Sequence, residues 1–246
     1  MDPDRTLRLL WRADPEPRRG PRPGLSVDAV VAAAVALADA AGLGALTMRR
    51  VAQHLGVAAM TLYTYVPGKE ELLELMLDAA YAAMPRTDTS GRPWRERAEA
   101  VAAENKALYA AHPWAATVST SRPPLGPGMM AKYEHELAAF DGLGLDDVTI
   151  DAALTHLLNF VRSAARDVAD ARALRQASAM TDAQWWAANA PLLERVLDPE
   201  AYPLATRVGS AAGAAQGSAY DPEHAYAFGL ARLLDGLAAL IDRPVS

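Results

Sequence analysis

Apolar residues recur at intervals of three and four along most of the chain, and this spacing restricts the fold more than any other feature. Alanine and leucine dominate these stretches, β-branched residues are sparse, and aromatic residues make up only 7% of the sequence. No stretch shows a sustained alternation of apolar and polar residues of the kind that strands prefer. The pattern therefore predicts an all-α protein.

Glycine, proline and capping residues divide these apolar stretches into separate helices. We expect helices at about 27–41, 48–55, 58–65, 69–84, 94–111, 114–119, 129–141, 146–172, 181–197 and 222–241. A polar, breaker-rich segment at 85–93 predicts a boundary between an N-terminal domain, 25–84, and a C-terminal domain, 94–246.

Two segments are expected to lack regular structure. Residues 1–24 contain five prolines and little apolar surface, which predicts a disordered arm. The Gly/Ala/Ser stretch at 209–219 has no large apolar side chains and is expected to be a disordered loop.

Composition excludes several classes of protein. The chain has no cysteine, which rules out disulfides, thiol nucleophiles and zinc fingers. The net charge is −6, so any surface that binds nucleic acid must be local. The longest apolar run, 29–38, is shorter than the roughly 20 residues of a membrane span, and the N-terminus shows no export signal. We therefore expect a cytoplasmic protein with no membrane partner.

Residues 46–69 have the spacing of a helix-turn-helix. Thr47 can cap a first short helix, Ala52 sits where two helices would cross, and Gly56 can adopt the positive φ of a tight turn. In such a motif the second helix enters the major groove of DNA. Residues 40–69 contain no Asp or Glu in a chain with 30 acidic residues, so they present a locally positive face. The residues expected to project from the second helix are Met60, Thr61, Tyr63, Thr64 and Tyr65.

Residues 25–78 resemble the N-terminal domain of the tetracycline-repressor (TetR) family. The resemblance is carried by Ala45–Ala52, by Leu55-Gly56-Val57 and by Thr61–Lys69. The C-terminal half resembles the regulatory domain of the tetracycline repressor's own branch, through Ser121-Arg122-Pro123, Asn159-Phe160 and 227–236. This resemblance implies a homodimeric, ligand-released regulator that binds a palindromic double-stranded DNA operator. The implied DNA-binding residues are Thr47, Arg49, Ala59, Met60, Thr61, Tyr63, Thr64, Tyr65 and Lys69.

A small organic effector is expected to bind among the C-terminal helices, and the helix at 69–84 would act as the lever. The candidate ligand-binding residues are Trp114, Tyr133, Glu136, His156, Asn159, Arg162, Ser163, Asp167 and Trp185. For each of these, the alternative is an ordinary core or surface residue. Alignment with the tetracycline repressor puts Val118 and Asn159 where that protein binds drug and magnesium through histidines. We therefore expect no metal, no cofactor and an effector other than magnesium–tetracycline.

Two other functions remain as alternatives. An all-helical enzyme has little support, because the sequence lacks the usual metal-binding, nucleophile and phosphate-loop motifs. A small-molecule-binding protein without sequence-specific DNA binding is the second alternative, because Ala58 and Ala59 give the recognition helix few hydrogen-bond donors.

Overall fold

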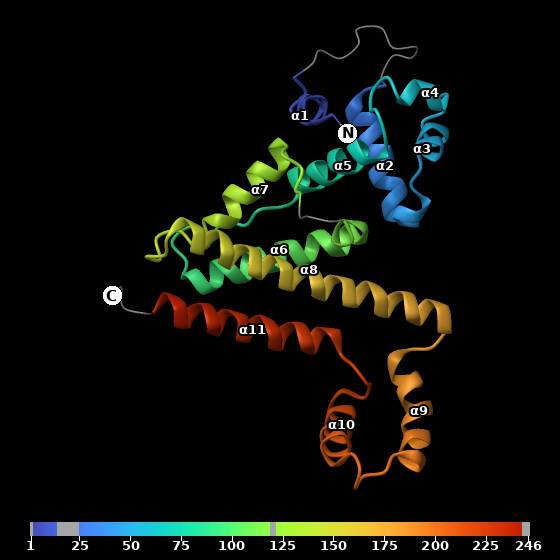
Figure 1. Ribbon diagram of the computed structural model, residues 1–246, viewed down its shortest axis with the longest axis vertical. Coiled ribbons are helices and arrows are strands. Elements are labelled where there is room, and N and C mark those ends of the chain that lie inside the picture. The colour runs from blue at the N-terminus through green and yellow to red at the C-terminus, as the bar shows by residue number, and fades with distance from the viewer. Residues whose placement is uncertain (1, 14–24, 119–121, 243–246) are drawn as a thin grey trace. The chain divides into compact units, whose positions relative to one another are not determined.

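The computed structural model describes residues 2–13, 25–118 and 122–242, and within these ranges the chain forms helices and connecting turns without strands (Figure 1). The all-α prediction is confirmed. The elements are α1 (Pro3–Leu10), α2 (Val27–Ala41), η1 (Leu43–Ala45), α3 (Met48–His54), α4 (Ala59–Leu62), α5 (Lys69–Ala83), α6 (Trp94–Ala111), η2 (Pro113–Ala116), α7 (Pro127–Leu137), α8 (Asp147–Ser178), α9 (Asp182–Val196), α10 (Pro203–Gln216) and α11 (Pro222–Ile241).

The chain divides into two compact units, one formed by residues 1–165 and 239–246 and the other by residues 166–238. In the first unit, α5 packs against α7, α2 and α1, and α3 packs against α2 and α4. The boundary expected at 85–93 lies inside the first unit, where α5 and α7 pack closely together from either side of that segment. The boundary stays a prediction.

The core around α2 is apolar. Val30, Val51 and Leu62 are fully buried, each from a different helix. Burying side chains of this size contributes about 1.5–3 kcal/mol each, so these contacts hold the three short N-terminal helices together. Ser26 caps α2 by accepting a hydrogen bond from Ala29 N at 3.1 Å, and Thr47 caps α3 by accepting one from Arg50 N at 3.2 Å.

The prediction of an irregular arm is wrong for residues 3–10, which form α1. Pro3 occupies the first turn, where its missing N–H costs nothing, and the Asp2 side chain accepts from Asp4 N and Arg5 N. Thr6 and Leu10 are buried, and α1 packs against α5. This packing stabilises the helix and could not be seen in the local sequence. The remainder of the expected arm, 14–24, lies outside the described residues.

The prediction of a disordered loop at 209–219 is also wrong, because α10 extends to Gln216. Gly213 lies against the ring of Trp186, where a Cβ would come within 2.8 Å of a ring carbon. The small residues of α10 therefore allow it to pack closely against Trp186 on α9. Gly217, with a φ of +64°, ends the helix.

Candidate nucleic-acid interface and ligand pocket

The helix-turn-helix expected at 46–69 is formed by α3, a turn and the short α4. Gly56 has a φ of +66°, a left-handed conformation that glycine adopts without strain. The chain then turns back, and Val57 N donates to Ala52 O at 2.9 Å. Ala52 is 2% exposed, which confirms that a small residue stands where the helices meet. Figure 1 shows α3 and α4 adjacent to each other beside α2.

Most of the predicted DNA-binding residues lie on the surface of this motif. Met60 is 75% exposed and Tyr63 is 41% exposed. Thr47, Arg49, Thr64 and Lys69 are exposed, and Ala59 and Thr61 are half-buried. The Thr64 hydroxyl donates to Thr61 O at 2.6 Å, so it is oriented back along the helix. We call the exposed set Arg49, Met60, Tyr63, Thr64 and Lys69 the reading face.

Tyr65 is a correction to the predicted set, because its side chain is only 4% exposed. The regular part of α4 ends at Leu62, and Tyr65 N donates to Leu62 O in the turn that follows. This turn directs Tyr65 into the core beside the buried Val66. Tyr65 therefore supports the reading face from within and does not belong to it.

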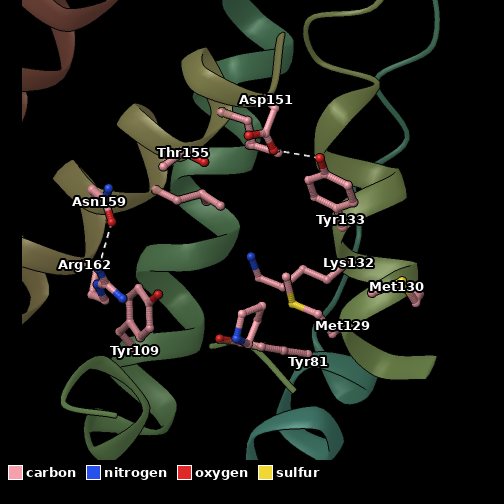
Figure 2. A pocket seen from close by; sticks show the side chains of 13 residues that line it. Tyr81, Tyr109, Met129, Met130, Lys132, Tyr133, Asp151, Thr155, Asn159 and Arg162 are labelled. Atoms are coloured by element: carbon pink, nitrogen blue, oxygen red, sulfur yellow. Dashed lines mark hydrogen bonds between the residues drawn. The ribbon is translucent and has the colours of Figure 1, made fainter. Parts of the chain in front are cut away.

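A pocket of about 320 Å³ lies in the first unit, among α5, α6, α7 and the first half of α8 (Figure 2). This volume falls in the usual range for small-molecule sites, roughly 300–1,000 Å³. We call it the ligand pocket. Its lining residues are Tyr81, Tyr109, Pro123, Met129, Met130, Lys132, Tyr133, Asp151, Leu154, Thr155, Leu158, Asn159 and Arg162.

Three of the predicted ligand residues, Tyr133, Asn159 and Arg162, line this pocket. The Tyr133 hydroxyl donates to Asp151 Oδ1 at 2.7 Å, and Arg162 Nη2 donates to Asn159 Oδ1 at 2.7 Å (Figure 2). The bond to the Asp151 carboxylate raises the pKa of Tyr133 above its usual value. Each of these two polar pairs is therefore already oriented by a hydrogen bond within the pair.

A buried polar network lies behind Lys132, another residue that lines the pocket. Lys132 Nζ donates to Glu136 Oε2 at 2.7 Å, and the Glu136 side chain is fully buried. Asn105 Nδ2 donates to Glu136 Oε1 at 2.5 Å. Burial lowers the pKa of Lys132, and the nearby Glu136 carboxylate opposes that shift. Glu136 thus acts through Lys132 and does not itself line the pocket.

The other predicted ligand residues lie elsewhere. Trp114 is buried and donates from Nε1 to Asp39 Oδ1 at 2.7 Å, which connects η2 to α2. His156 and Ser163 are exposed on α8 and are not among the lining residues. Asp167 and Trp185 belong to the second unit. Ser121 lies outside the described residues, and among those described no group of three or more His, Asp or Glu side chains could hold a metal ion.

Sequence reasoning missed Tyr81, Tyr109 and Lys132, which together form much of the pocket wall. Tyr81 stands near the end of α5, and burial raises the pKa of its hydroxyl well above the usual range. The spacing of Lys132 and Glu136, four residues apart on one helix, is a signal for an ion pair that the sequence did contain. Nothing in the sequence indicated that this pair would be buried.

The contact between α5 and α7 is close. Asp78, on α5, accepts a hydrogen bond from Met129 N at 2.8 Å near the start of α7. Burial raises the pKa of Asp78, and the hydrogen bonds from Met129 and Gly128 partly offset that shift. A Cβ at position 128 would collide with the backbone oxygen of Asp78, so only glycine fits there. One helix, α5, therefore carries Lys69 at its first residue and packs against the pocket near its last turn.

This architecture, a helix-turn-helix followed by a helical domain with an internal pocket, defines a class of DNA-binding regulators. Residues 30–76 match the family described as bacterial regulatory proteins, tetR family, and residues 85–241 match the tetracyclin repressor-like C-terminal domain. The chain belongs to the TetR family of transcription regulators.

Individual relatives sharpen this assignment. The chain is 42% identical over 238 residues to the HTH-type transcriptional repressor DrrR1 of Streptomyces coeruleorubidus, covering 96% of this chain and 86% of that one. Among solved structures, ActR of Streptomyces coelicolor in complex with actinorhodin is similar with a TM-score of 0.74 and 26% identity, over 89% of this chain and 97% of ActR. BioQ bound to its double-stranded DNA operator is similar with a TM-score of 0.54 and 28% identity, over 62% of this chain and 90% of BioQ.

Proposed function

We propose that this protein is a cytoplasmic repressor that binds a palindromic operator as a homodimer and is released by a small organic effector. The observation that carries the proposal is the arrangement of α5, which begins at the reading face and packs against the ligand pocket near its other end. An effector that prefers a different position of α5 would shift the population away from the DNA-bound form. The named relatives support this assignment, because one is a repressor and another is bound to its operator.

The reading face supports binding to DNA. Arg49 and Lys69 are exposed cations that can contact phosphates, while Tyr63 and Thr64 offer hydroxyls. Met60 is the most exposed residue of this face and can meet the methyl group of thymine. Because no acidic residue occurs between positions 40 and 69, this face attracts DNA although the whole chain is acidic.

A homodimer is supported by the exposed apolar residues of α11, such as Phe228, which is 60% exposed. By length and composition, α11 is also the one described helix that could cross a membrane. The matched C-terminal domain extends through residue 241, so we assign this apolar face to a partner subunit. Two paired reading faces would reach successive major grooves, about 34–36 Å apart.

The effector we propose is an organic molecule other than magnesium–tetracycline. Asn159 lines the pocket. The resemblance aligns Val118 and Asn159 with the two histidines through which the tetracycline repressor binds drug and magnesium, so neither imidazole is present here. ActR, a structural neighbour, has been solved with actinorhodin and with (S)-DNPA, so a pocket in a similar fold accepts organic molecules.

A mobility-shift titration on DNA from around the gene tests the DNA-binding proposal. We expect a palindromic site, with Arg49→Ala and Lys69→Ala each weakening binding by about tenfold and lowering the salt dependence by about one unit of slope. Arg92→Gln removes an exposed cation far along the chain from the reading face and serves as the control. Binding that shows no sequence preference at low salt would instead favour a small-molecule-binding protein without an operator.

A further inference from the structure

The ligand pocket is lined by several aromatic and thioether side chains. Tyrosines 81, 109 and 133 enter from three different helices, and Met129 and Met130 add two thioethers (Figure 2). Aromatic rings and methionine sulfur pack favourably against the faces and edges of other aromatic rings. An aliphatic ligand would gain only the burial of its surface here, whereas an aromatic one would gain these contacts as well.

Lys132 supplies a hydrogen-bond donor inside this aromatic enclosure. Its side chain is 4% exposed, yet it is one of the residues that line the pocket. The ammonium group has three N–H donors, and among the described residues the single acceptor that it meets is Glu136. The centre of the Tyr81 ring lies 5.2 Å from Nζ, so a cation–π interaction also stabilises the ammonium charge. A buried ammonium with unused donors would gain from an acceptor atom on the ligand.

The charges around Lys132 indicate that this acceptor is neutral. Glu136 already balances the ammonium at 2.7 Å, and its carboxylate is fully buried. A second anion at Lys132 would be repelled by Glu136 in surroundings that screen charge weakly. The other lining charges, Asp151 and Arg162, also have opposite signs. A carbonyl oxygen accepts the same hydrogen bond without adding charge.

We infer that the effector is a neutral aromatic ketone whose carbonyl oxygen accepts a hydrogen bond from Lys132 Nζ. This inference rests on the proposed function, because it names the chemical class that the regulator's pocket recognises. Glu136 is a positioning residue, since it holds the Lys132 ammonium in place through its carboxylate. The tyrosines would pack against the aromatic part of this molecule, and the carbonyl would set its orientation.

Three probes that share one ring system test this assignment. Fluorene is apolar, fluorenone adds one ketone oxygen, and fluorenecarboxylate adds a negative charge. We expect the wild-type protein to bind fluorenone about tenfold more tightly than fluorene, the gain from one hydrogen bond to a buried charged donor. We expect fluorenecarboxylate to bind more weakly than fluorenone. Equilibrium dialysis gives the three dissociation constants.

The double variant Lys132→Met with Glu136→Gln tests whether the preference for fluorenone over fluorene depends on Lys132. It removes both charges together, so no unpaired charge is left in the core. We expect the ratio of fluorenone to fluorene affinity to fall to about one. The double variant Arg95→Met with Glu99→Gln removes an exposed ion pair of the same spacing on α6 and should keep the wild-type ratio. Circular dichroism confirms that both variants are folded.

The inference is overturned if the wild type binds none of the probes, binds fluorenone and fluorene equally, or prefers the carboxylate. It is also overturned if the ketone preference survives in the Lys132/Glu136 variant. Operator binding by the wild type without any probe is measured in parallel. If the wild type binds its operator but shows no preference for the ketone, the effector class alone is refuted, whereas absent operator binding by the wild type refutes the proposed function.

Discussion

The helix-turn-helix region and the ligand pocket use polar residues in opposite ways. From Val27 to Val66, every buried side chain is apolar or aromatic, and the polar residues lie outside. Around the pocket, Glu104, Asn105, Lys132 and Glu136 are buried. A surface that meets DNA must keep its donors in water until the partner arrives. A pocket that selects among small molecules must keep its donors dry, where each hydrogen bond discriminates more strongly.

The largest expected effect concerns the buried ion pair beside the pocket. Lys132→Met leaves Glu136 charged and unpaired in the core, which should lower the free energy of unfolding by about 3–5 kcal/mol. The double variant Lys132→Met with Glu136→Gln should recover most of that loss. Urea unfolding followed by circular dichroism measures both. Equal losses in the single and double variants would show that the pair contributes packing and not charge balance.

Two tyrosines of the helix-turn-helix region, two residues apart, allow a buried and an exposed position to be compared. Tyr65→Ala should cost about 3 kcal/mol of stability, because it leaves a cavity at a side chain that is 4% exposed. Tyr63→Ala should change stability by less than about 0.5 kcal/mol and instead weaken operator binding.

Thermal unfolding and mobility-shift titrations of the two variants give both quantities. If Tyr65→Ala kept its stability and lost DNA binding, the reading face would have to include Tyr65, and the original sequence-based set would be restored.

Replacing two helical glycines by alanine should change the stability of the protein in opposite directions. Gly128→Ala should destabilise the protein by about 1–3 kcal/mol, since the added Cβ collides with the backbone of Asp78. Gly209→Ala meets no atom within 4 Å and lies inside α10, so it should stabilise by up to about 1 kcal/mol. Melting temperatures of the two variants should therefore move in opposite directions. A stable Gly128→Ala protein would mean that α5 and α7 can separate easily.

The smallest expected effect concerns Trp11 and Arg12, the two residues that directly follow α1. Trp11 Nε1 donates to Leu125 O at 2.8 Å ahead of α7, and Arg12 Nη2 pairs with Asp28 Oδ1 on α2 at 2.5 Å. Trp11→Phe removes the hydrogen bond and should cost about 1 kcal/mol or less, since the indole is half exposed. Trp185→Phe, at a similarly exposed tryptophan, is the matched control. An equal change in both variants would show that the Trp11 bond adds nothing.

The helix-turn-helix was predictable because its signals are contiguous. Spacing, capping residues and the absence of acids from 40 to 69 all occur within one short segment, and the helices at 94–111 and 222–241 were placed correctly from their boundaries. The pocket was only partly predictable, because Tyr81, Tyr109 and Lys132 come from separate helices that meet only after folding. Tyr65 and α1 were misjudged for the same reason, since burial depends on neighbours that local sequence does not reveal.

The collision that excludes every side chain larger than hydrogen at position 128 has a pharmacological consequence. At this contact α5 and α7 meet with no room for a side chain and with a hydrogen bond from Met129 N to the Asp78 carboxylate, so we expect a rotation of α7 to move α5 with it. Under the proposed function, affinity and efficacy would then be separate properties of a ligand. A molecule that fills the cavity and leaves α7 in place would act as an antagonist, however tightly it is held.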